Sequence, residues 1–72
     1  MKKINKIKIK LNGKFIKIQD KTTLLSLMQK LKLPIKKVAI ELNQTIVNKK
    51  LLGKIKVKKN NKIEIVNFIG GG

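Results

Sequence analysis

Apolar and polar residues alternate along the first part of the chain. Isoleucine or leucine occupies every second position from Ile7 to Leu11, and lysines fill the positions between them. This period of two is typical of a strand that buries one face. Asn12-Gly13 follows, a pair that favours a two-residue hairpin turn because both residues tolerate positive φ. The alternation then resumes, so the pattern predicts a β-hairpin over residues 4–19.

The period changes to that of a helix in the next segment. Leucine and methionine recur at positions i, i+3, i+4 and i+7 across residues 24–31, which places them in one apolar stripe. Thr22 or Thr23 can cap the N-terminus by accepting a backbone N–H. Pro34 disfavours helical geometry at the residue before it, so the helix is expected to end near Lys32. We interpret the stripe as a core face and not as a cofactor site.

The second half of the chain predicts shorter strands separated by turns. Residues 38–42 are more apolar than the hairpin, so we expect them to lie more centrally in the sheet. Residues 45–47 are expected to form a short strand, and residues 48–54 an irregular segment with an apolar anchor. Ile63 and Ile65 mark one face of the last strand.

The elements follow in the order strand, strand, helix, strand, short strand and strand, which suits one sheet curled over one helix. The leucine stripe would face the apolar side of the sheet, and lysines would cover the other side. The expected fold class is α+β, a ubiquitin-like β-grasp with a mixed sheet. We expect one β-grasp domain over residues 1–69 and a flexible Gly-Gly-Gly tail over residues 70–72.

Charge is the most unusual feature of the composition. The 72 residues carry a formal net charge of +16, and every positive side chain is a lysine. A basic surface suggests nucleic acid or an anionic membrane, but arginine, which favours bidentate phosphate contacts, is absent. Phe15 and Phe68 are the only aromatic residues that could stack on bases. We therefore expect no specific nucleic acid. Lysine, isoleucine and asparagine, which all have A/T-rich codons, fill 38 of the 72 positions, so we interpret the lysine content as the codon bias of a low-GC genome. Because lysines discourage pairing between sheet edges, we expect a soluble monomer.

The composition also excludes most catalytic and metal-binding arrangements. The chain has no cysteine and no histidine, so the usual nucleophilic dyads and triads cannot form. Asp20, Glu41 and Glu64 are the only acids; two of them could come close in a folded sheet, but their number falls short of an ordinary metal site. We expect no catalytic residue, no metal and no cofactor of its own. Without a signal peptide or a membrane span, a cytoplasmic location is the default expectation.

The last three residues offer a different kind of chemistry. Gly70, Gly71 and Gly72 carry no side chains, and three extended residues reach about 10 Å. Such a segment can enter a narrow channel that excludes other residues. A terminal carboxyl group has a pKa of about 3.5, so it is ionised and a poor electrophile at neutral pH. Chemistry at that carbon needs activation by another enzyme, and a frayed tail without function is the alternative.

Two segments carry a resemblance to a known family. Residues 38–47 read VAIELNQTIV, and residues 62–72 read KIEIVNFIGGG. With the element order, the length and the terminal glycines, they are similar to the ThiS family of sulfur carrier proteins of thiamine biosynthesis. The resemblance spans nearly the whole chain, is weak in the first hairpin, and departs from the family in its lysine content.

The resemblance implies a sulfur carrier on which other enzymes act. An ATP-dependent adenylating enzyme (ThiF-like) would activate the carboxylate of Gly72. A sulfur donor such as a cysteine desulfurase would convert it to a thiocarboxylate, and thiazole synthase (ThiG-like) would receive the sulfur. Gly70 and Gly71 would thread into the partner's active site. Phe68 and Ile69 would dock on its surface, with plain strand packing as the alternative for Phe68.

Three other functions remain as alternatives to this carrier. The small subunit of molybdopterin synthase shares the fold and the terminal thiocarboxylate, but its chains tend to be longer. A ubiquitin-like modifier needs the same carboxyl activation. A basic nucleic-acid-binding domain belongs to a different class, and its binding would follow the logarithm of the salt concentration and survive loss of Gly71 and Gly72.

Overall fold

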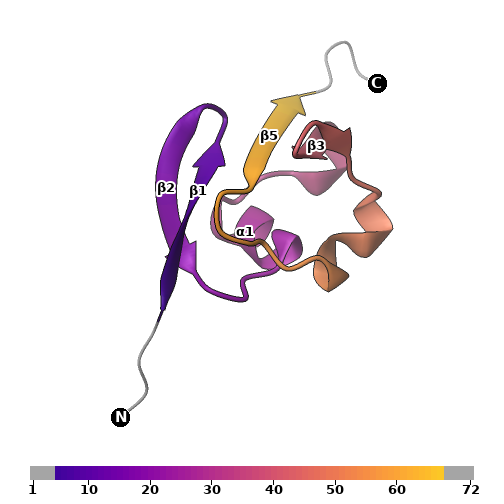
Figure 1. The fold of residues 1–72 in the computed structure, drawn as a ribbon. Helices are drawn as coiled ribbons and strands as arrows, with labels where there is room; N and C mark the ends of the chain where they lie inside the picture. Colours follow the sequence, from indigo (N-terminus) through magenta and orange to yellow (C-terminus); the bar gives the residue numbers. More distant parts are fainter. Residues whose placement is uncertain (1–4, 68–72) are drawn as a thin grey trace.

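The computed structural model describes residues 5–67, in which a five-stranded mixed sheet curls over one helix (Figure 1). The strands lie in the order β2-β1-β5-β3-β4. β1 and β5 run parallel, and the other neighbouring strands run antiparallel. The elements are β1 Lys6–Leu11, β2 Lys14–Gln19, α1 Leu24–Lys30, β3 Val38–Leu42, β4 Thr45–Ile46 and β5 Lys62–Asn67, with 3₁₀ helices η1 Ile35–Lys37 and η2 Lys49–Lys54. The predicted α+β class is confirmed.

The predicted hairpin is formed by β1 and β2. Its turn residues, Asn12 and Gly13, have φ of 48° and 84°, and positive φ at both positions is what a type I′ turn requires. The register sets Ile7 opposite Ile18, so apolar side chains of both strands share the face that covers the helix. Ile9 on this face is 1% exposed. The alternation in the sequence therefore predicted the buried face as well as the strands.

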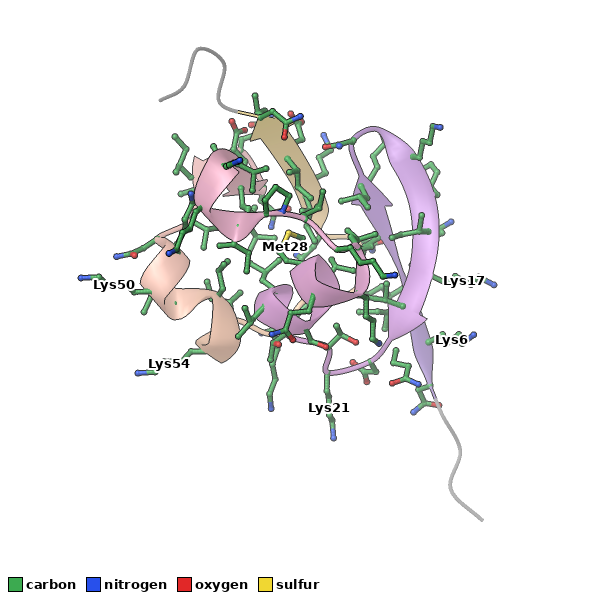
Figure 2. All side chains as sticks on the ribbon, turned by 180° about the vertical axis from the view of Figure 1, so that it is seen from behind. Lys6, Lys17, Lys21, Met28, Lys50 and Lys54 are labelled. Carbon is green, nitrogen blue, oxygen red and sulfur yellow. The ribbon has the colours of Figure 1, made fainter. Side chains whose placement is uncertain are left out.

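Helix α1 begins at a threonine cap. Thr23 has extended geometry, with φ of −81° and ψ of 159°, and its Oγ1 accepts a hydrogen bond of 3.1 Å from the N–H of Ser26. Leu24, Leu27 and Met28 are buried, and Figure 2 shows Met28 between the helix and the strands. The cap is the second of the two threonines considered, and the apolar stripe faces the sheet as predicted.

The helix ends two residues before the predicted position. The N–H groups of Lys32 and Leu33 donate to the carbonyls of Gln29 and Met28, at 3.1 and 3.2 Å, which is a Schellman motif. Lys32 holds the left-handed position of this motif with φ of 55°, a place that glycine usually occupies. Leu31, the last residue of the predicted stripe, becomes the C-cap and is 38% exposed.

The middle strand of the sheet is β5 and not β3. Residues 38–42 were expected to lie more centrally than the hairpin. This is correct for β2, which is an edge strand, but wrong for β1, because β1 and β3 are each the second strand from an edge. Ile63 of β5 lies opposite both Leu11 of β1 and Leu42 of β3, and it is fully buried. The sheet is thus centred on the last strand of the chain.

The segment between β4 and β5 is anchored by apolar side chains. Within η2, Leu52 is 2% exposed, which confirms the predicted anchor. Further on, Val57 is 1% exposed, and its N–H donates to the carbonyl of Thr22 at 2.7 Å. Labelled lysines point outward from several elements in Figure 2. No helix within residues 5–67 is long and apolar enough to cross a membrane.

Candidate functional site

The residues with predicted functional roles come directly after β5. All of them lie outside the described residues, so their roles stay predictions: Phe68, Ile69, Gly70, Gly71 and Gly72. The nearest described residue is Asn67, the last residue of β5. The way in which the sheet holds β5 therefore determines how the chain leaves the folded body.

Strand β5 pairs with a neighbour on each side. β1 runs parallel to it, with Lys10 opposite Lys62 and Leu11 opposite Ile63. β3 runs antiparallel to it and accompanies it as far as Asn67. Because β1 ends at Leu11, the second half of β5 continues past the end of β1.

The side chain of Asn12 continues the hydrogen bonding where β1 ends. The N–H of Asn12 donates to the carbonyl of Ile63 at 2.9 Å, and Asn12 Oδ1 accepts from the N–H of Ile65 at 2.7 Å. The left-handed backbone of Asn12, with φ of 48°, turns the chain into β2 after the first of these bonds. The side-chain oxygen of Asn12 thus accepts the hydrogen bond that its backbone carbonyl would accept if β1 continued as a strand.

Asn43 holds the beginning of β5 in a similar way. Its N–H donates to the carbonyl of Lys62 at 2.7 Å, and its Oδ1 accepts from the N–H of Lys62 at 2.8 Å. Asn43 has φ of 51° and opens the turn between β3 and β4. The sequence predicted the turn at Asn12 and a turn between the strands expected over residues 38–42 and 45–47, but it did not reveal these bonds. Their partners are 53 residues away from Asn12 and 19 residues away from Asn43.

The side of the sheet that faces away from α1, which we call the outer face, carries exposed apolar side chains. Phe15, Ile46 and Val66 are 66%, 71% and 52% exposed. Lys8 Nζ and Lys10 Nζ lie 4.9 and 5.3 Å from the centre of the Phe15 ring, within cation–π range. Val66 precedes the last residue of β5, so the outer face extends to the C-terminal end of that strand.

Two of the three acidic residues meet on the outer face. Glu41 of β3 lies directly opposite Glu64 of β5, which confirms that two acids come close in the sheet. Asp20 lies in the turn after β2, where its Oδ1 accepts from the N–H of Lys21 at 2.9 Å. Within residues 5–67, no group of three or more potential metal ligands occurs.

An open groove beside β4 and η2 is lined by apolar side chains. It has a volume of about 350 Å³, and its lining includes Ile46, Leu51 and Ile55. None of its lining residues is charged. Thr45 and Asn48 are its polar lining residues, so the groove offers mainly packing contacts and no charged group for a nucleotide phosphate or a metal ion.

Comparison with known proteins gives both a family and a fold. The ThiS family profile matches residues 4–72. The crystal structure of the thiamine biosynthesis protein (ThiS) from Geobacter metallireducens is similar, with a TM-score of 0.82 and 25% sequence identity. That similarity covers 92% of this chain and 100% of the other chain. The predicted β-grasp is confirmed by this likeness.

Two further relatives were found by sequence. Thiazole synthase of Magnetococcus marinus is 38% identical over 66 residues, which are 92% of this chain and 20% of that protein, so the chain spans about a fifth of its length. The uncharacterized protein ycf40 of Porphyra purpurea is 31% identical over 70 residues, which cover 96% of this chain and 99% of that protein. Given the profile match over residues 4–72 and the shared fold, the chain belongs to the ThiS family of sulfur carrier proteins in thiamine biosynthesis.

Proposed function

We propose that the sulfur is carried on the carboxyl carbon of Gly72. Membership of the ThiS family makes the chain a sulfur carrier and not a catalyst. The observation that supports Gly72 as the carrying residue is the position of β5. This strand lies in the middle of the sheet, and its last residue, Asn67, precedes Gly72 by five residues. The strand that leads to Gly72 is therefore held by the sheet on both sides.

Charging the carrier takes three chemical steps, all performed by other proteins. An adenylating enzyme joins the Gly72 carboxylate to the α-phosphate of ATP and releases pyrophosphate, which converts a poor electrophile into a reactive mixed anhydride. A persulfide from a donor such as a cysteine desulfurase attacks the acyl carbon and displaces AMP. The attack forms a C–S bond and gives an acyl disulfide. A thiol then attacks the donor's sulfur in this disulfide, breaks the S–S bond that came from the persulfide, and leaves the thiocarboxylate on Gly72 while the donor's sulfur remains in a disulfide with the thiol. The absence of cysteine fits this route, because the sulfur needs no thiol on the carrier.

The residues between β5 and Gly72 have two further roles in this proposal. Gly70 and Gly71 pass into the enzyme's active site, where the lack of Cβ atoms permits a narrow channel. Phe68 and Ile69 contact the enzyme at the entrance of that channel. The division of the chain into a β-grasp domain over residues 1–69 and a tail over residues 70–72 belongs to the same proposal.

We propose thiazole synthase as the acceptor of the sulfur. Support comes from the relative named thiazole synthase, of which a fifth resembles this chain, so that carrier-like and acceptor segments occur in one polypeptide there. The only nucleotide involved is the ATP used by the adenylating enzyme. We place the reaction in the cytoplasm, where ATP is abundant, and expect the free carrier to be a monomer.

Intact-protein mass spectrometry tests the proposal. The protein is incubated with ATP, the adenylating enzyme and a sulfur donor, and its mass should increase by one oxygen-to-sulfur exchange. Fragmentation should place the exchange on Gly72. Omission of ATP should abolish it. An unchanged mass in the complete mixture would refute the carrier function at this residue.

Glycine variants separate the tail from the folded body. Gly71→Val should abolish the exchange, because its branched Cβ would obstruct a channel built for glycine. Gly53→Ala is the matched control: an added Cβ there would lie 3.5 Å from Leu25 Cδ2, an ordinary contact. This control should be charged as well as the original protein. A second incubation with thiazole synthase or with the large subunit of molybdopterin synthase then identifies the acceptor.

A further inference from the structure

Charge is divided between the two halves of the outer face. The register of β1 with β2, and of β1 with β5, places a set of lysines together on one half. We call this set the lysine half; it contains Lys6, Lys8, Lys10, Lys17 and Lys62. Lys8 and Lys17 lie directly opposite each other within it. Figure 2 shows Lys6 and Lys17 extending from this part of the sheet.

The other half of the outer face contains no lysine among its paired positions. Glu64 of β5, Glu41 of β3 and Ile46 of β4 form one cross-strand row. Val66 of β5 and Ala39 of β3 form the next row. Directly opposite residues point to the same side of a sheet, so these five side chains share one surface. We call it the acidic-apolar half.

Folding does not account for the composition of the acidic-apolar half. Glu41 and Glu64 are like charges opposite each other, an arrangement that destabilises a sheet. The chain has three acids against 19 lysines, yet two of the acids form this unfavourable pair. Beside them, Ile46 and Val66 are 71% and 52% exposed. Such a surface fits contact with another molecule better than contact with water.

We propose that the acidic-apolar half is the docking surface for the enzyme that adenylates Gly72. The complementary surface of that enzyme would place a basic side chain opposite Glu41 and Glu64, apolar groups against Val66 and Ile46, and acidic groups opposite the lysine half. This inference rests on the proposed function. It adds the location and the chemistry of the contact.

Chain geometry favours an enzyme that reacts with Gly72 over other occupants, and of these enzymes the adenylating one is the first to bind the carrier. Five residues separate Asn67 from Gly72, and five extended residues span at most about 18 Å. An active site that reacts with Gly72 must therefore lie within that distance of the end of β5. Val66 and its cross-strand neighbour Ala39 are at this end of the sheet, so an enzyme that holds the tail lies beside the acidic-apolar half.

The division of charge would fix the orientation of the bound carrier. With the carrier turned by half a revolution on its partner, Glu41 and Glu64 would face acidic groups, and the lysine half would face the basic group. Like charges in contact disfavour that arrangement, whereas opposite charges favour the correct one. The correct orientation directs the end of β5 toward the active site.

The test measures adenylation by ATP–pyrophosphate exchange, with the concentration of carrier varied. Glu41→Gln and Glu64→Gln should each raise KM, and the double variant should raise it by about tenfold or more while kcat stays the same, because the lost contact lies outside the reacting atoms. Asp20→Asn is the matched control, because it also removes one negative charge but at a distant place in the sheet. Asp20 follows β2, and the last residue of β2, Gln19, pairs with Lys6 at the beginning of β1. Strand β5 pairs with the other end of β1. Its KM should stay within about twofold of the original.

Thermal denaturation of the same variants distinguishes docking from folding. Neutralising either glutamate removes the cross-strand repulsion but also removes one of the few negative charges among the lysines, so the melting temperature should change little. Weaker docking by an equally stable variant supports the inference. An unchanged KM, or the same rise in KM for Asp20→Asn, overturns it while the proposed function stands. Failure of the original protein to be adenylated at all overturns both.

Discussion

At the scale of single residues, Lys32 is an example of backbone strain at the end of a helix. Its φ of 55° at the left-handed position of the Schellman motif disfavours a residue with a Cβ. Lys32→Gly should increase the free energy of unfolding by up to about 1 kcal/mol, once the greater flexibility of glycine in the unfolded chain is subtracted.

Urea denaturation measures this effect, and Lys30→Gly serves as its control. Lys30 is the last residue of α1, so glycine there should lower stability, by up to about 1 kcal/mol. Both variants remove one lysine, and net charge therefore cannot explain a difference between them. Equal changes in the two variants would contradict the role given to the positive φ of Lys32.

Asn12 combines a positive φ with a hydrogen bond that sequence reasoning did not foresee. Asn12→Gly keeps the backbone geometry but loses the bond to Ile65 N–H, and it should cost about 0.5–1.5 kcal/mol. Asn12→Ala also introduces backbone strain, so it should cost up to about 1 kcal/mol more than the glycine variant, once the greater flexibility of glycine in the unfolded chain is subtracted.

Two measurements separate the contributions of Asn12. Chemical denaturation gives the free energy of each variant, and amide hydrogen exchange reports the Ile65 N–H directly. Exchange at Ile65 should accelerate in both variants, because both lack the accepting Oδ1. Unchanged exchange would show that the carboxamide of Asn12 does not hold β5.

Local patterns in the sequence predicted features that depend on neighbouring residues, such as turns, and missed hydrogen bonds between residues that are far apart in the sequence. The Asn12-Gly13 turn follows from the φ preferences of two adjacent residues. The bond from Ile65 to Asn12 spans 53 positions and leaves no periodic signal. The exposure of Leu31 was likewise unpredictable, because it results from where the Schellman motif ends the helix.

At the scale of elements, hydrophobic periodicity located β1, β2 and α1 and identified their buried faces. It did not identify β5 as the middle strand, because that position depends on the parallel pairing of β5 with β1, which lies at the other end of the sequence. Apolar composition was a poor guide to centrality for β3, since β1, β3 and β5 each bury one face against the core and leave the other on the outer face. The number of buried faces, and not the rank in the sheet, sets how apolar a strand is.

Two adjacent leucines in η2 provide a test of the predicted anchor. Leu52 is 2% exposed, and Leu51 is 43% exposed. Leu52→Ala should reduce the free energy of unfolding by about 2–5 kcal/mol because it leaves a cavity in a small core. Leu51→Ala should cost less than about 1 kcal/mol. Thermal denaturation of the two variants is the measurement, and similar losses would mean that Leu52 is not the anchor of this segment.

At the scale of the whole molecule, the formal charge of +16 dominates the electrostatics. Repulsion among lysines destabilises the folded state, and dissolved ions screen it over about 8–10 Å at ordinary salt concentrations. We expect the melting temperature to rise as sodium chloride increases from low to moderate concentration. The same melting temperature across this range would contradict a lysine-covered outer face.

A single substitution tests whether this salt dependence originates on the sheet. Lys8→Gln removes one member of the directly opposed pair with Lys17. It should raise the melting temperature at low salt and reduce the gain from added salt. Lys54→Gln, at the end of η2, removes the same charge away from the sheet and should have a smaller effect.

The overall architecture and the family were predictable from the sequence, because one helix between short strands has few ways to bury its apolar stripe. The similarity to a solved thiamine biosynthesis protein and to a thiazole synthase also favours the thiamine carrier over the molybdopterin synthase subunit. The surroundings of the tail were not predictable. The opposition of Glu41 and Glu64 depends on the register of two strands that are far apart in the sequence.

The central position of β5 also has a mechanical consequence. A strand at the edge of a sheet can be peeled away one hydrogen bond at a time, whereas β5 is held by β1 and Asn12 on one flank and by β3 on the other. Tension applied to the C-terminal end is therefore shared between two rows of bonds. An enzyme that pulls on this end meets resistance from the whole sheet, and the carrier can be drawn in without unravelling.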